Sequence, residues 1–168
     1  EIATLATPST AGMAVPIPKN ATKIAYAVSL VMCGNDNGNS AALIDSSLVL
    51  RHSVHNISVR NPDSGSKYDY KMYAIVHKQA KKCSEPLRRS GFEILVVDPP
   101  ILPNEIRGET VRKGVHRAFC CGHHEFVKLY AYNKIPEEIF VHTDIDFAFL
   151  QPMDHLFDAM LYDKDSEE

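Results

Sequence analysis

The chain has 168 residues, enough for one domain with a sizeable hydrophobic core. Its composition, 45% hydrophobic and 23% charged, is that of an ordinary globular protein. The formal net charge of −3 gives no electrostatic reason to expect binding to nucleic acid or to an acidic membrane surface. No apolar run in the sequence reaches the length of a membrane-spanning helix.

Residues 1–22 are rich in Ala, Thr, Ser and Pro and show no sustained hydrophobic period, so we expect a flexible stalk or linker. Residues 23–32 are nearly continuously apolar, which predicts a strand covered on both faces. A cluster of turn-forming residues follows, and Ser40 or Asn39 is expected to cap a helix that ends near His55.

Two more strands are predicted, one at 70–77 and a buried one at 92–97, where short apolar runs are bounded by polar or turn-forming residues. Between them, 78–90 predicts a basic surface helix that is interrupted near Pro86 and ends at Gly91.

The second half of the chain begins with a basic stretch, 99–120, that shows no clear period. A helix is then expected at 123–133, a buried strand at 139–141 and a short amphipathic helix at 153–158. The residues expected on the inner face of the first of these helices are Phe126, Val127, Leu129 and Tyr130. Strands that alternate with helices predict an α/β fold with a mainly parallel sheet.

Two carboxylates, Asp144 and Asp146, directly follow the predicted strand at 139–141. Side chains two residues apart in an extended segment point the same way, so these carboxylates are expected to converge. Unless a positive charge lies between them, one would take up a proton. Mn²⁺ or Mg²⁺ would suit such ligands and leaves open positions for phosphates. Open α/β sheets bind their ligands at the carboxyl ends of strands, which supports such a site, although an isolated Asp-x-Asp is more often an ordinary polar turn.

The cysteines and asparagines give weaker signals. Cys33, Cys83, Cys120 and Cys121 match no zinc-finger spacing and permit three disulfide connectivities. A metal cluster at 120–124 is not expected, because adjacent ligands at a helix start cannot all face one ion. Asn20-Ala-Thr and Asn56-Ile-Ser are N-glycosylation sequons, which favour a secretory location only weakly because such triplets are common by chance.

Three stretches carry a resemblance to a known family: Tyr26-Ala-Val-Ser-Leu30, Phe126-Val-Lys-Leu129, and His142-Thr-Asp-Ile-Asp146 with the following 150–158. Together they resemble the N-terminal half of retaining glycosyltransferases of family eight, the glycogenin-like group. The similarity covers roughly residues 23 to 160, and the aspartate motif with its Leu-Phe-Asp tail is its most specific part. The resemblance implies a GT-A nucleotide-diphospho-sugar fold, Rossmann-like and truncated, over 23–168.

The resemblance also implies roles for matching residues. Asp144 and Asp146 would be the DxD carboxylates that hold Mn²⁺, or Mg²⁺, against the diphosphate of UDP, with Asp144 also near the ribose. Lys128 would lie near the donor sugar or phosphates, and Arg112 or Arg117 would supply a second basic group. The remaining positions implied in the UDP-sugar site are Val28, Ser29, Leu30, Met32 and Ile145.

The activity implied is transfer of a hexosyl or pentosyl group from a UDP-sugar to a hydroxyl of a glycan, protein or lipid-linked acceptor, with retention of configuration. Family members complete the metal site with a histidine from their C-terminal half. His142 and His155 do not match that histidine, so the third metal ligand and the acceptor contacts are expected outside this chain. A membrane tether outside the chain and a homodimer stay open. The Golgi or secretory lumen is favoured weakly over the cytoplasm.

Two other functions remain as alternatives. One is a partial or inactive nucleotide-sugar-binding module without transferase activity. The other is a phosphatase of the haloacid-dehalogenase type, in which the first aspartate of a DxD motif is a nucleophile. Too little chain follows the motif for that class, and Phe147 and Ala148 replace its usual Gly-Thr or Gly-Val.

Overall fold

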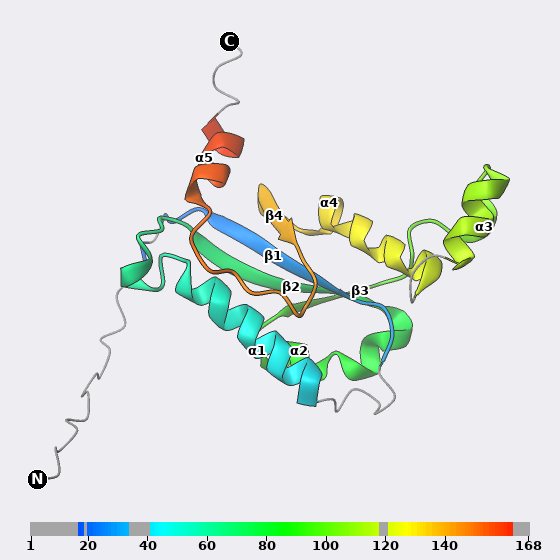
Figure 1. Ribbon diagram of the computed structural model, residues 1–168, viewed down its shortest axis with the longest axis horizontal. Coiled ribbons are helices and arrows are strands. Elements are labelled where there is room, and N and C mark those ends of the chain that lie inside the picture. Colours follow the sequence, from blue (N-terminus) through cyan, green and yellow to red (C-terminus); the bar gives the residue numbers. More distant parts are fainter. Residues whose placement is uncertain (1–16, 19, 34–40, 118–120, 163–168) are drawn as a thin grey trace, which may run out of the picture.

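Four strands form one all-parallel sheet in the order β3-β2-β1-β4 (Figure 1). Their bounds are β1 Lys23–Leu30, β2 Asp69–His77, β3 Glu93–Val97 and β4 Ile139–His142. The computed structural model describes residues 17–18, 20–33, 41–117 and 121–162, and the expected stalk and the expected helix cap at 39–40 lie largely or wholly outside them. The α/β class with a parallel, Rossmann-like sheet is therefore confirmed.

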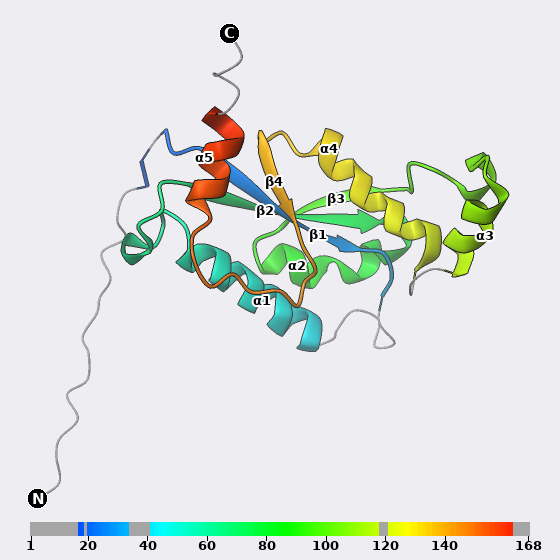
Figure 2. The same cartoon turned by 45° about the horizontal axis from the view of Figure 1, so that its top comes forward.

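Helices cover both faces of the sheet (Figures 1 and 2). One face packs against α1 and α2, and the other packs against η4 and α4. The α-helices are α1 Ala41–Asn56, α2 Glu85–Arg89, α3 Glu109–Arg117, α4 Ala131–Lys134 and α5 Asp154–Tyr162. The 3₁₀ segments are η1 Pro62–Ser64, η2 Lys78–Cys83, η3 Pro103–Glu105 and η4 Gly122–Tyr130.

The alternation of side chains along β1 divides the core into two layers. Ile24, Tyr26 and Val28 face α1, whereas Ala25 and Ala27 face η4 and α4, and all five are at most 3% exposed. Burying one large apolar side chain stabilises the fold by about 1.5–3 kcal/mol. The two apolar layers explain why the strand reads as a nearly continuous hydrophobic run, as predicted for a strand covered on both faces.

The prediction that 139–141 is a buried strand is only partly correct. Among the residues that the structure describes, β4 pairs only with β1 and forms an edge of the sheet. Of its residues only Ile139 is buried, at 5% exposure. An isolated apolar run indicates a strand but does not say how many neighbours it has, because pairing depends on the rest of the chain.

Two predicted helices differ from the structure. The segment 78–90 is divided into η2 and α2, with Pro86 in the first turn of the second, where the missing N–H costs nothing. The predicted helix at 123–133 is mostly 3₁₀. With three residues per turn, His124, Val127 and Tyr130 face the sheet, while Leu129 is 44% exposed, so the prediction that Leu129 faces inward is wrong.

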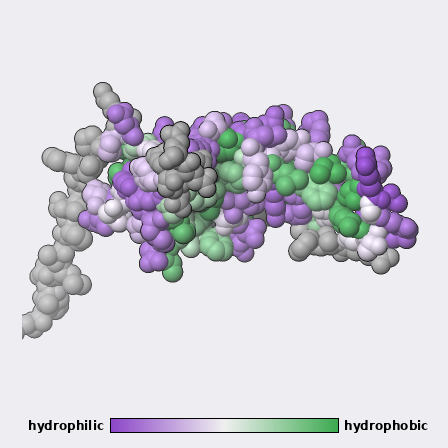
Figure 3. Space-filling view, turned by 90° about the horizontal axis from the view of Figure 1, so that it is seen from above, coloured by the Kyte–Doolittle hydropathy of each residue, from purple (hydrophilic) through white to green (hydrophobic). Residues whose placement is uncertain are grey.

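A disulfide joins Cys33, after β1, to Cys83, the last residue of η2. It therefore connects the segments that leave the carboxyl ends of β1 and β2. Apolar side chains also reach the surface along the length of the molecule (Figure 3). Among the residues described, no helix combines the length and the apolar character needed to cross a bilayer.

Candidate functional site

A cavity of about 440 Å³ opens at the carboxyl end of β4, and we name it the Asp144 cavity. Its lining residues are Lys128, Val141, His142, Thr143, Asp144, Phe147 and Phe149. After β1 the chain first forms β2 and β3 on one side, and only later returns to place β4 on the other side. The carboxyl ends of β1 and β4 thus form a topological switch point, where open α/β sheets bind ligands.

The loop after β4 is held in place by β1 and α1. The backbone N–H of Thr143 donates to the carbonyl of Ala27 at 2.9 Å, which extends the strand pairing beyond β4. Six residues on, the N–H of Phe149 donates to the Ser53 hydroxyl of α1 at 3.1 Å. The Phe149 ring also packs edge-on against Tyr26, with 5.2 Å between the ring centroids. These contacts carry the loop back across the end of the sheet.

The two aspartates occupy different positions in this loop. Asp144 is exposed and lines the cavity, whereas Asp146 is exposed but is not among the lining residues. The N–H of Phe147 donates to the Asp144 carbonyl at 3.3 Å, so the chain turns at 145–146 rather than continuing as a strand. The extended geometry that would make both carboxylates converge therefore ends at Asp144, and their joint binding of one ion stays a prediction.

Lys128, on η4, supplies a positive charge to the cavity. Its ammonium group lies 2.7 Å from the Glu125 carboxylate, one 3₁₀ turn earlier on η4. Both side chains are partly solvent-exposed, so this pair adds little to stability. An anionic ligand would compete with Glu125 for the ammonium group.

His142, the last residue of β4, links the carboxyl end of β4 to that of β1. Its Nε2 lies 2.8 Å from the Ser29 hydroxyl of β1. Burial, reinforced by the nearby Lys128, holds the pKa of the imidazole below its ordinary value of 6.5, although Asp144 and Glu125 act in the opposite direction. The ring is therefore neutral at pH 7, and Lys128 rather than His142 provides the cavity's positive charge.

A serine and a histidine at this distance also occur in nucleophilic enzymes, where a third group orients the base. Among the described residues no carboxylate hydrogen-bonds to the other ring nitrogen of His142, and Ser29 does not line the cavity. The pair is therefore best described as a tie between β1 and β4.

The other residues implied in the UDP-sugar site are dispersed. Val28 is buried in the core, and Leu30 and Ile145 pack against the core from partly buried positions. Met32 is 47% exposed, after the end of β1. Arg112, on α3, does not line the cavity, and the side chain of Arg117 lies outside the described part.

Sequence reasoning did not assign His142, Thr143, Phe147 or Phe149 to the site, although all four line the cavity. The signal for His142 was present, because strand alternation places it on the same face as Phe140, which packs towards η4 and α4. No sequence signal marks the two phenylalanines, because their position depends on the turn and on the Ser53 contact.

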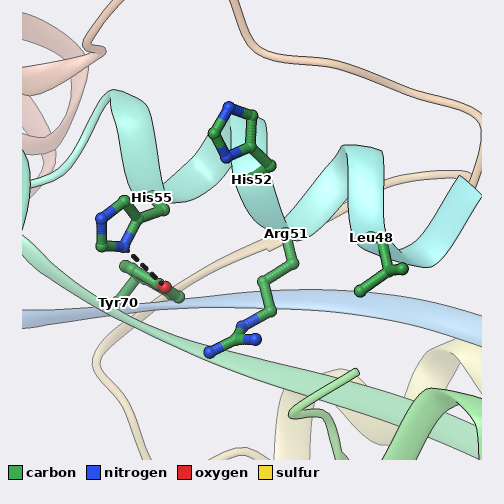
Figure 4. Close-up of a pocket in the computed structure, with 5 residues that line it drawn as sticks. All are labelled: Leu48, Arg51, His52, His55 and Tyr70. Carbon is green, nitrogen blue, oxygen red and sulfur yellow. Dashed lines mark hydrogen bonds between the residues drawn. The ribbon is translucent and has the colours of Figure 1, made fainter. Parts of the chain in front are cut away.

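A second cavity, of about 380 Å³, lies between α1 and β2 (Figure 4). Leu48, Arg51, His52, His55 and Tyr70 line it, and His55 Nδ1 lies 3.3 Å from the Tyr70 hydroxyl. Burial and the neighbouring cations keep the pKa of His55 below 6.5.

Comparison of the chain with protein-family models, with curated proteins and with solved structures gives no match. The assignment to the α/β class with a four-stranded parallel sheet therefore follows from the strand order and pairing themselves.

Proposed function

We propose that the Asp144 cavity binds the nucleotide of a UDP-sugar and that the chain is the nucleotide-sugar-binding part of a retaining, metal-dependent glycosyltransferase. One observation supports this most. A carboxylate, Asp144, and an ammonium group, Lys128, line the same cavity at the switch point of a parallel sheet. A diphosphate needs both a cation site and a hydrogen-bond donor of positive charge.

The residues fit a metal that is shared with the substrate. The described residues contain no group of three or more His, Cys, Asp or Glu that could hold an ion. Mg²⁺ and similar ions are commonly bound by one or two carboxylates, with phosphates and water completing the shell. Asp144, assisted by Asp146, would hold Mn²⁺ or Mg²⁺ in this way. When bound, the ion supplies positive charge that stabilises the diphosphate as it leaves the sugar.

Lys128 would donate to a diphosphate oxygen and stabilise the same developing charge. The exposed ring of Phe147, 54% accessible, offers an apolar surface that a bound ligand would cover. Transfer would then join the anomeric carbon of the sugar to an acceptor hydroxyl. The Ser29–His142 tie would keep β1 and β4 in register beneath the bound nucleotide.

Calorimetry of UDP binding with and without Mn²⁺ tests the proposal on the parent chain and on Asp144→Asn. Asn preserves the backbone bond from Phe147 and removes only the charge. Asp63→Asn is the matched control, because Asp63 is also exposed but lies in η1, away from the cavity. We expect Mn²⁺-dependent binding in the parent and the control and its loss in Asp144→Asn.

Lys128→Met should weaken UDP binding about tenfold or more, because a hydrogen bond to a charged group contributes about 1.5–3 kcal/mol. Binding that is indifferent to Mn²⁺ and to Asp144→Asn would exclude the metal–diphosphate site. Binding with hydrolysis or transfer absent for every UDP-sugar would instead favour the module without transferase activity.

A further inference from the structure

We propose that the chain is N-glycosylated at Asn20 and Asn56, and that it therefore matures in the secretory lumen. This inference does not depend on the nucleotide site. It rests on the surroundings of the two sequons, on the disulfide and on the end of the sheet at which the asparagines lie.

Asn56 is exposed at the last position of α1, where a glycan can project into solvent. Its amide Nδ2 donates to His52 Nε2 at 3.0 Å, and its backbone carbonyl accepts from Asn61 Nδ2 at 2.8 Å. An amide nitrogen has two hydrogens, so attachment of a glycan replaces one and leaves the other for His52. Ser58, which completes the sequon, is only 4% exposed, but the sequon would be recognised before the chain folds.

Asn20 lies just before β1 and is exposed, as is Thr22, which completes its sequon. The carbonyl of Thr22 accepts from the N–H of Asp69, the first residue of β2, at 2.9 Å. This bond fixes the sequon at the amino end of the sheet. Neither the Asn20 side chain nor the Thr22 side chain is required by the core.

The disulfide supports the compartment. Cys33 and Cys83 are 50 residues apart in sequence, with 5.9 Å between their Cα atoms, and Cys83 is 1% exposed. Such bonds persist in oxidising compartments and are rare in reducing cytosol. Sequons are common by chance, but here both asparagines are exposed and the chain also carries a disulfide with one buried cysteine, and the two observations together favour the secretory compartment.

The positions of the sequons are also compatible with a working site. Because α1 returns from the carboxyl end of β1 to the start of β2, its last residue lies at the amino end of the sheet, near the start of β1 (Figure 1). The Asp144 cavity lies at the opposite, carboxyl end. Glycans at Asn20 and Asn56 would leave the mouth of that cavity open.

In the reaction, the asparagine amide nitrogen attacks the anomeric carbon of an oligosaccharide linked to a lipid pyrophosphate. A C–N bond forms, the C–O bond to the pyrophosphate breaks, and the pyrophosphate leaves with the bonding electrons. The amide nitrogen loses one proton to a base of the transferring enzyme.

The test uses the chain isolated from the organism that makes it. Peptide N-glycosidase in heavy-oxygen water converts each glycosylated asparagine to a labelled aspartate, which peptide mass spectrometry locates. We expect label at Asn20 and Asn56 and none at Asn61, which is followed by proline and lies outside any sequon. Each glycan should slow the chain in gel electrophoresis by one glycosidase-sensitive step. In the same cells, Asn56→Gln and Thr22→Ala should each remove one such step, whereas Thr22→Ser should keep both.

An unlabelled peptide at either sequon overturns the proposal for that asparagine. Unlabelled peptides at both, together with alkylatable thiols at Cys33 and Cys83, overturn the secretory assignment as well. Because the readout is covalent and read by mass, a failure of nucleotide binding would not affect it.

Discussion

Replacing both Cys33 and Cys83 by alanine should lower the free energy of unfolding by about 4 kcal/mol. The disulfide joins positions 50 residues apart. In the chain-entropy relation, a closed loop of that length removes enough freedom from the unfolded state to give this value at about 25 °C. Cys83 is also buried, so the alanine at that position adds a small cavity cost.

Urea unfolding measures the change directly. With a denaturant slope of about 2 kcal/mol per molar, the midpoint should fall by about 2 M. Reductant added to the parent and to the variant alike provides the control, because without the Cys33–Cys83 bond the two midpoints should nearly coincide. Equal midpoints for parent and variant under oxidising conditions would refute the loop-closure reasoning and, with it, a structural role for the bond.

The remaining predictions concern α5, the histidines and the cavity. Phe157→Ala should destabilise the fold by about 3–5 kcal/mol in urea, because the 4%-exposed ring anchors α5 against Tyr68; a change below about 1 kcal/mol would mean that α5 is not held by this contact. Burial holds the pKa values of His77 and His124 below 6.5, so the unfolded state binds protons that the folded state does not, and stability should fall as the pH drops below about 6.5. His124→Gln should make the free energy of unfolding fall less steeply as the pH drops, and an unchanged dependence on pH would contradict the role assigned to His124. Glu125→Gln should tighten UDP binding by freeing Lys128, and a calorimetric affinity equal to that of the parent would show that the ion pair does not compete with the ligand.

The parts of the fold that sequence predicts well are those set by local pattern. β1, β2 and β3 begin and end within two residues of the predicted runs, because short apolar runs bounded by polar turns mark strands. β3 is nevertheless an edge strand of the described sheet in which only Val97 is buried, so the prediction of a buried strand there is only partly correct. The helix at 41–56 follows for the same local reason. The all-parallel arrangement follows from the alternation of strands and helices.

The parts that sequence predicts poorly depend on distant residues. β4 is as apolar as its neighbours, yet it lies at an edge, because only β1 is available to pair with it among the described residues. The 3₁₀ form of η4 is not visible in a helical pattern, since spacings of three and four residues both satisfy one. His124 faces inward because His77, at the end of β2, stacks on it with 4.5 Å between the ring centroids.

The candidate site divides in the same way. Asp144 and Lys128 were predicted as site residues through the family resemblance, and the structure places both in one cavity. Asp146 was expected to converge with Asp144 on the assumption of an extended chain. The turn at 145–146 removes that assumption, and a turn of this kind follows from where Phe149 must go to meet Tyr26 and Ser53 rather than from the aspartates.

These contacts also explain how an edge strand can position a site. β4 has one buried residue, so its own packing fixes its carboxyl end weakly. The loop beyond it is instead fixed by bonds to the sheet's interior and to α1: Thr143 to Ala27, His142 to Ser29, and Phe149 to Ser53. Ala27, at 0% exposure, belongs to the most buried strand pair of the molecule. The position of the Asp144 carboxylate is thus determined by β1 and α1. Substitutions at buried positions of these two elements should displace the carboxylate, although none of their residues lines the Asp144 cavity.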